Sequence, residues 1–306
     1  MTADVVVVNW NGRDVLASCL EHLTRQTREY TLIVVDNGSD DGSVEMVRER
    51  FPQARLIELK ENRGFGAAVG AAVDAGDGEV IVLVNNDVDV ESGFVEAIVA
   101  PFERDPQVGM VAGLTTIPGS DLVDGFGIEL DVTLAAYNRL RRQLPDERVG
   151  VLAMPSGGAA AYRRTAFEAA GGFEPALFAY GEDLDLGLRL QAAGWRAAAA
   201  ADARGVHLGG ASVGVDSPRQ RYLAGFARGF VLRRYGVLRS AAAPRALLVE
   251  ALVVAWGLAR HRTAIPLRAR LDGWRAARGR RLPAQASAID RSISLREALR
   301  RLRSAR

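Results

Sequence analysis

Short, continuously apolar runs alternate with segments of helical spacing along the first half of the chain. Such runs are typical of strands that are buried on both faces of a sheet. Between them, apolar residues recur at the spacing of a helix face. The alternation predicts an α/β domain with a Rossmann-like, mainly parallel sheet flanked by helices. We expect strands at 5–8, 31–35, 56–59 and 80–84, and helices at 16–23, 43–51 and 66–75.

Asparagine and aspartate follow each of these four apolar runs. Because the carboxyl ends of parallel strands meet at one edge of the sheet, where ligands bind, we expect a binding site there. Both residue types also favour turns and helix N-caps. That preference readily explains one or two such positions, but it explains four of them less well. The residues are Asn9, Trp10 and Asn11, then Asp36 and Asn37, then Asn62, and finally Asn85, Asn86 and Asp87.

The acidic cluster after the fourth run favours a metal site. Asp87 and Asp89 would repel a nucleotide diphosphate unless a divalent cation lay between them, and Mg²⁺ and Mn²⁺ prefer oxygen ligands of this kind. Acidic turns without a metal are also common. The glycines from Gly64 to Gly70 match neither the P-loop pattern nor the dinucleotide-binding pattern G-x-G-x-x-G. We expect instead that they allow a helix to approach the nucleotide closely.

The second half of the chain is patterned less evenly. Residues 105–150 look irregular apart from a strand near 108–112, and helices are expected at 163–170 and 182–193. Glu182 and Asp183 begin the second of these helices. Acids in the first turn of a helix are stabilised by the helix dipole, which is one explanation for these residues. The other is that they provide a general base, a carboxylate that accepts the hydroxyl proton of an acceptor. His207 lies in a short segment that ends at Gly209 and Gly210, which suggests that this histidine is at the edge of a site and ligates a metal.

Charge divides the chain at about residue 215. Residues 1–215 hold 18 basic and 32 acidic residues, whereas 216–306 hold 21 arginines and 5 acidic residues. We therefore expect a catalytic domain over 1–215 and an arginine-rich helical region over 216–306. Basic amphipathic segments such as 266–281 and 295–303 suit an anionic membrane surface. Alternatively, the arginines are solvated or pair with the acidic domain.

Other features narrow the class of protein. No nucleic-acid-binding module is recognisable, and the acidic half would repel a polyanion, so nucleic acid is not an expected partner. Cys19 is a single cysteine, which we expect to be buried on its helix rather than reactive. No signal peptide is evident, and the apolar stretch 246–259 is shorter than the roughly 20 residues that span a bilayer.

Seven segments together resemble glycosyltransferase family 2, whose members are inverting enzymes with a GT-A fold, and are most similar to its bacterial rhamnosyltransferase-type branch. They occur in the family's order and cover roughly residues 4–212. The segments are VVVVNWNG (5–12), VVDNGSDDGS (34–43), ENRGFGAAVGAA (61–72), LVNNDVDV (83–90), SGGAAAYRR (156–164), GGFEPALFAYGEDLDLGLRLQAAGW (171–195) and HLGGAS (207–212).

The resemblance implies a role for each matching position. Asp183 matches the catalytic base, and His207 matches a histidine that ligates the metal in several members. The family's D-x-D motif falls on Asn85-Asn86-Asp87, with Asn85 in place of the first aspartate, while Asp87-Val88-Asp89 spells the motif two residues later. Asp87 belongs to both registers. The nucleotide-sugar site is implied at Asn9, Trp10, Asn11, Asp36, Asn62, Gly64, Phe65, Gly66, Asn85, Asn86 and Asp87, and the acceptor site at Gly157, Gly158, Tyr180, Glu182 and Trp195.

The activity that the resemblance implies is inverting transfer of rhamnose or another hexose from a UDP- or dTDP-sugar to a hydroxyl group. The acceptor would be a glycan or a polyprenyl-linked glycan, the cofactor Mg²⁺ or Mn²⁺, and the location the cytoplasm at the inner face of the cell membrane. Two alternatives stay open. Asn85 favours a non-catalytic nucleotide-sugar-binding relic, and a nucleotidyltransferase would also need acids, a metal and an α/β sheet.

Overall fold

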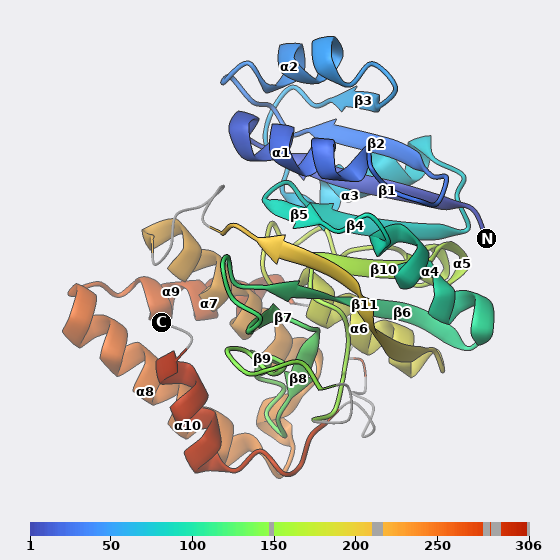
Figure 1. Cartoon of the computed structure of the whole chain (residues 1–306). Coiled ribbons are helices and arrows are strands. Elements are labelled where there is room, and N and C mark those ends of the chain that lie inside the picture. Colours follow the sequence, from blue (N-terminus) through green and yellow to red (C-terminus); the bar gives the residue numbers. More distant parts are fainter. Residues whose placement is uncertain (147–149, 210–216, 278–281, 283–288, 305–306) are drawn as a thin grey trace.

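A mixed sheet with helices on both faces forms the first two thirds of the molecule. In the computed structural model, which describes residues 1–146, 150–209, 217–277, 282 and 289–304, nine strands form the main sheet. Their order is β3-β2-β1-β4-β10-β6-β11-β5, with β7 paired to β6, so the sheet extends from β3 at the top of Figure 1 down to β6 and β11. The predicted α/β fold with a mostly parallel central sheet is confirmed.

The amino-terminal half matches its sequence pattern closely. Alternate side chains of β1 enter two different cores: Val5 and Val7 pack with α1, α2 and α4, whereas Val6 packs with α3, α5 and α6. A strand buried on both faces therefore needs an unbroken apolar run. The elements are β1 (Ala3–Asn9), α1 (Arg13–Leu23), β2 (Thr31–Asp36), α2 (Ser43–Arg50), β3 (Arg55–Glu58), α3 (Phe65–Ala75), β4 (Val80–Asn85), β5 (Val88–Val90) and α4 (Phe94–Arg104).

The segment expected to be irregular contains several strands, so that part of the prediction is wrong. Alanine-rich runs, which carry little strand signal, form β10 and much of β11, and the helix expected from residue 163 begins one residue later, after β10. The elements are β6 (Val108–Thr116), β7 (Val123–Gly125), β8 (Ile128–Leu130), β9 (Ala136–Asn138), β10 (Ala159–Arg163), α5 (Arg164–Ala169), α6 (Glu182–Ala192) and β11 (Arg196–His207).

The carboxy-terminal region is helical, as expected. It consists of α7 (Pro218–Arg234), the short 3₁₀ helix η1 (Val237–Arg239), α8 (Ala243–His261), α9 (Ile265–Ala276) and α10 (Leu295–Ser304). These helices lie beside the lower half of the sheet in Figure 1, on the side to which β11 points. None of the described helices is long and apolar enough to cross a bilayer.

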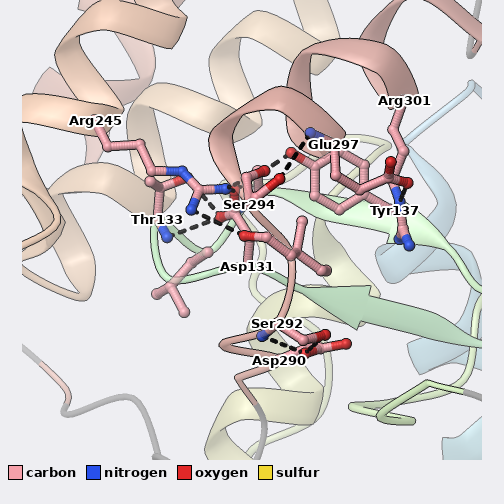
Figure 2. Close-up of polar contacts among 12 residues, drawn as sticks. Asp131, Thr133, Tyr137, Arg245, Asp290, Ser292, Ser294, Glu297 and Arg301 are labelled. Carbon is pink, nitrogen blue, oxygen red and sulfur yellow. Dashed lines mark hydrogen bonds and ion pairs between the residues drawn. The ribbon is translucent and has the colours of Figure 1, made fainter.

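Ion pairs join this region to the β8–β9 hairpin. Arg245 donates to the buried carboxylate of Asp131 at 2.8 Å (Figure 2). Arg301 of α10 pairs with the buried Glu129, and its guanidinium lies 5.5 Å from the ring of Tyr137. Some arginines therefore pair with acids of the first 215 residues, which was one of the two uses expected for them. Whether residue 215 bounds a domain stays a prediction.

Candidate active site

Side chains from three adjacent strand ends form a hydrogen-bonded network. The amide of Asn9, fully buried at the end of β1, donates to Asp36 and Ser39 at 3.3 Å. Its oxygen accepts from Asn86, after β4, at 2.7 Å. Asp36 in turn accepts from the backbone N–H groups of Gly38 and Ser39, which closes the turn after β2. Asn9 and Asp36 therefore hold the strand ends together beneath the surface.

A second network shapes the loop before α3. Asn37 donates to Asn62 at 3.2 Å, and Asn62 accepts from the backbone of Gly64 at 3.0 Å. Gly64 has φ +88°, and a Cβ atom there would lie 2.5 Å from the carbonyl oxygen of Phe178. Both the left-handed backbone and the close approach of Phe178 require glycine at this position.

A cleft of about 290 Å³ opens at this edge of the sheet. It brings together twelve of the residues predicted for the site, from five separate stretches of sequence. They are Trp10, Asn62, Gly64, Phe65, Asn85, Asn86, Asp87, Gly157, Gly158, Tyr180, Glu182 and Asp183.

Asp183 lies in the cleft with its carboxylate held from two sides. The backbone N–H of Gly157 donates to one carboxylate oxygen at 2.8 Å, and the hydroxyl of Tyr162 to the other at 3.4 Å. Burial raises the pKa of Asp183, and these two hydrogen bonds oppose the rise. Burial also raises the pKa of the neighbouring Glu182, and the charge of Asp183 adds to that effect. Raised carboxyl pKa values in a cleft suit a general base that works near neutral pH.

Asp87, His207 and Asp124 form a line of charged groups beside the cleft. The Nε2 atom of His207 lies 3.3 Å from Asp87, and its Nδ1 atom lies 2.6 Å from Asp124. Hydrogen bonds to Asp124 and then Asp87 raise the pKa of His207 to about 10. A metal ligand must be the neutral ring, so a cation bound here would displace that proton. Among the described residues, no group of three or more His, Cys, Asp or Glu side chains has the arrangement of a metal site.

Several predicted site residues lie elsewhere. Asp89 accepts from Ser18 of α1 at 2.9 Å and lies 3.5 Å from His22, so the structure does not bring its carboxylate to Asp87. Trp195 packs against Gly109, at the far end of α6 from Asp183. Asn11 and Gly66 flank the cleft without lining it. Cys19 is buried, as expected.

Sequence reasoning missed Arg219, which α7 contributes to the cleft. Its guanidinium lies 5.1 Å from the ring of Trp10 and 5.2 Å from that of Phe178. It makes no ion pair with any residue in the described part of the chain. Nothing in the sequence separates this arginine from the twenty others after residue 215. Asp124 carried no signal either, because it lies in the segment expected to be irregular.

Comparison with known proteins identifies the family. The model of glycosyl transferase family 2 matches residues 4–171. An N-acetylglucosaminyl-diphospho-decaprenol L-rhamnosyltransferase from Mycobacterium tuberculosis is 30% identical over 241 residues, covering 69% of this chain and 78% of its own. An N-acetylglucosaminyltransferase from Rhizobium meliloti is 30% identical over 207 residues, which cover 63% of this chain and 48% of the relative.

Solved structures support the fold. A mannosyltransferase from Pyrobaculum calidifontis in complex with GDP-Man and Mn²⁺ superposes with a TM-score of 0.57 at 20% identity, over 90% of this chain and 79% of that one. The structure of GalNAc-T7 with UDP, GalNAc and Mn²⁺ superposes with a TM-score of 0.61 at 16% identity, over 81% of this chain and 51% of that one. The fold is thus that of a GT-A glycosyltransferase. The chain belongs to glycosyltransferase family 2 and is a glycosyltransferase.

Proposed function

We propose that this enzyme transfers a sugar, rhamnose or another hexose, from a UDP- or dTDP-sugar to a hydroxyl of a glycan or polyprenyl-linked glycan, with inversion. The observation that carries the proposal is the joint placement of Asp183, Asp87 and Arg219 around one cleft. The similar mycobacterial protein, named for an N-acetylglucosaminyl-diphospho-decaprenol acceptor and rhamnosyl transfer, supports the choice of sugar and acceptor.

Asp183 is the proposed general base. The acceptor oxygen attacks the anomeric carbon as its proton passes to the carboxylate of Asp183, and the bond from that carbon to the diphosphate oxygen breaks. A new glycosidic bond and a free nucleoside diphosphate result. The short hydrogen bond from the Gly157 N–H, at 2.8 Å, fixes one carboxylate oxygen, and the other, which accepts only a long hydrogen bond of 3.4 Å from Tyr162, is the one proposed to take the proton. A single displacement needs no nucleophilic side chain.

Asp87 and His207 are the proposed holders of Mg²⁺ or Mn²⁺. A cation there would supply Lewis-acid stabilisation of the departing diphosphate. The donor set fits, because a ligating histidine usually donates its second ring N–H to a carboxylate, as His207 is placed to do with Asp124. Phosphate oxygens of the donor would supply further ligands beside these two side chains. Asn85 lines the cleft but brings no charge.

Binding of a nucleotide sugar should raise the melting temperature. A ligand at 100 times its dissociation constant stabilises the folded state by about 2.7 kcal/mol. We expect a thermal-shift screen of UDP-, dTDP- and GDP-sugars, with Mg²⁺ or Mn²⁺, to give its largest shift with a UDP- or dTDP-sugar. Incubation with an acceptor should then release nucleoside diphosphate. Release of pyrophosphate would indicate a nucleotidyltransferase instead.

Replacement of Arg219 should weaken donor binding. The guanidinium lies over two rings and makes no ion pair within the described residues, so its N–H groups are placed to donate to a phosphate oxygen. A hydrogen bond to a charged group contributes about 1.5–3 kcal/mol, so Arg219→Gln should raise the KM for the donor by about 10- to 100-fold, with a smaller change in kcat. Arg204→Gln, which alters an exposed arginine of β11, is the control. Equal KM values for both variants would remove Arg219 from the donor site.

A further inference from the structure

Helix α8 presents a wide apolar face outward. Seven of the ten exposed large hydrophobic side chains among the described residues lie on α8 and α9. From Leu247 to Ala259, every exposed position of α8 is leucine, alanine or tryptophan. At 3.6 residues per turn, these positions cover about half of the circumference of the helix. Contiguous apolar surface of this extent usually marks an interaction site.

The opposite face of α8 is fixed to the molecule. Glu250 pairs at 2.6 Å with Arg228 of α7 and with Arg270 of α9. Gly257 lies against Pro266, so that α8 and α9 approach closely. The helix is therefore held in a defined orientation, and its apolar face is displayed rather than left over from poor packing.

Exposed arginines border this apolar face. Arg260 and Arg262 lie at the carboxyl end of α8. On α9, Arg268 and Arg275 lie 3.7 and 3.3 Å from the carboxylate of Asp272, and their side chains remain 80% and 64% exposed. Two further exposed leucines, Leu267 and Leu271, lie along the same helix. Leucines and tryptophan with a basic border are the chemistry of a helix that lies in the headgroup region of a membrane.

We propose that α8 and the adjoining face of α9 dock on an anionic lipid surface. The leucines of both helices and Trp256 would enter the boundary between headgroups and acyl chains, and the bordering arginines would contact lipid phosphates. A second copy of the chain is the alternative occupant of this face, and the test below distinguishes it from a lipid surface.

The position of the surface differs from the sequence expectation. Of the two basic segments, α10 is turned inward, since its Ala298 is buried beside Tyr137 and Arg301 pairs with Glu129. The other, 266–281, contributes α9, whereas α8 was not expected to take part. The described helices of this region lie on the side of the sheet to which β11 points (Figure 1), and Arg219 of α7 reaches the cleft. Docking through α8 would bring to the lipid a helix that is ion-paired, through Glu250 and Arg228, to the helix that carries Arg219.

Sedimentation with vesicles tests the proposal on the full chain, without donor or acceptor. We expect binding to vesicles of phosphatidylcholine with about one third phosphatidylglycerol, and little binding to phosphatidylcholine alone. The double variant Leu248→Gln, Leu252→Gln should bind at least about tenfold more weakly, because it removes inserted apolar surface. Glutamine is a good helix former, and both leucines are nearly half exposed, so melting followed by circular dichroism should show a folded protein.

Two further variants sharpen the result. Arg262→Gln with Arg268→Gln should weaken binding and reduce its sensitivity to salt, since charge attraction is screened. Leu144→Gln changes an exposed leucine outside this surface and should bind as the unaltered chain does. Equal recovery in the supernatant with and without vesicles would overturn the proposal. So would a dimer in light scattering that the leucine variant converts to monomer, which would assign the face to a second copy.

Discussion

Asp183→Asn should abolish nearly all sugar transfer while leaving donor binding intact. The amide oxygen can still accept the hydrogen bond from Gly157 N–H, so the loop geometry is kept. The amide cannot take a proton from the acceptor, and a positioned general base contributes about 10²- to 10⁴-fold. We expect kcat to fall by that factor and the donor-induced shift in melting temperature to be unchanged. The two measurements together separate lost chemistry from lost binding.

Glu182→Gln is the matched control, because the two carboxyls are adjacent and both line the cleft. Burial and the charge of Asp183 favour the protonated form of Glu182, which glutamine imitates, so this variant should retain most transfer. The reverse pattern, with activity lost in Glu182→Gln and kept in Asp183→Asn, would make Glu182 the base.

The pH profile gives an independent check. The base must be ionised, and burial raises the pKa of Asp183 above the value of about 3.9 for a free aspartate. Transfer by the unaltered enzyme should therefore rise with pH through this raised pKa. The residual activity of Asp183→Asn should lack that rise.

The amino-terminal sheet was predictable because its inner strands β1, β2 and β4 are buried on both faces and its helices on one. The side chains of Val5 to Val8 point alternately into the two cores, so every position of the strand must be apolar. An unbroken apolar run in the sequence therefore predicts such a strand. The alanines of β10 and β11 are different, since alanine is small enough for either face and favours helices when taken alone. Their strand conformation comes from the pairing of β10 with β4 and β6 and from the pairing of β11 with β6.

The candidate site was predictable where it follows strand ends and hidden where it depends on distant contacts. Asn9, Asn86 and Asp87 follow from the rule that parallel strands deliver ligands at their carboxyl ends. Arg219 reaches Trp10 across more than 200 residues of sequence, in a region where arginine is the commonest charged residue. Asp124 is similarly recognised only through its contact with His207.

The two D-x-D registers predict opposite results for Asp87→Asn and Asp89→Asn. Residues i and i+2 of a strand share a face, but Asp87 lies in the turn before β5 and Asp89 lies within the strand. Their carboxylates accordingly diverge, one to His207 and the other to Ser18. If the cation is held by Asp87, this carboxylate is a direct ligand, whereas Asp89 supports the packing of α1.

Asp87→Asn should remove the dependence of donor binding on Mg²⁺ or Mn²⁺ and lower transfer by at least about 100-fold, since loss of even an outer partner of a metal ligand costs about 10- to 100-fold. Asp89→Asn should leave both unchanged and lower the free energy of unfolding by about 1 kcal/mol, because a neutral amide still accepts from Ser18 but more weakly. Thermal shift with donor, with and without cation, measures the first effect, and urea unfolding measures the second. A cation response lost in Asp89→Asn and kept in Asp87→Asn would place the metal in the later register, away from His207.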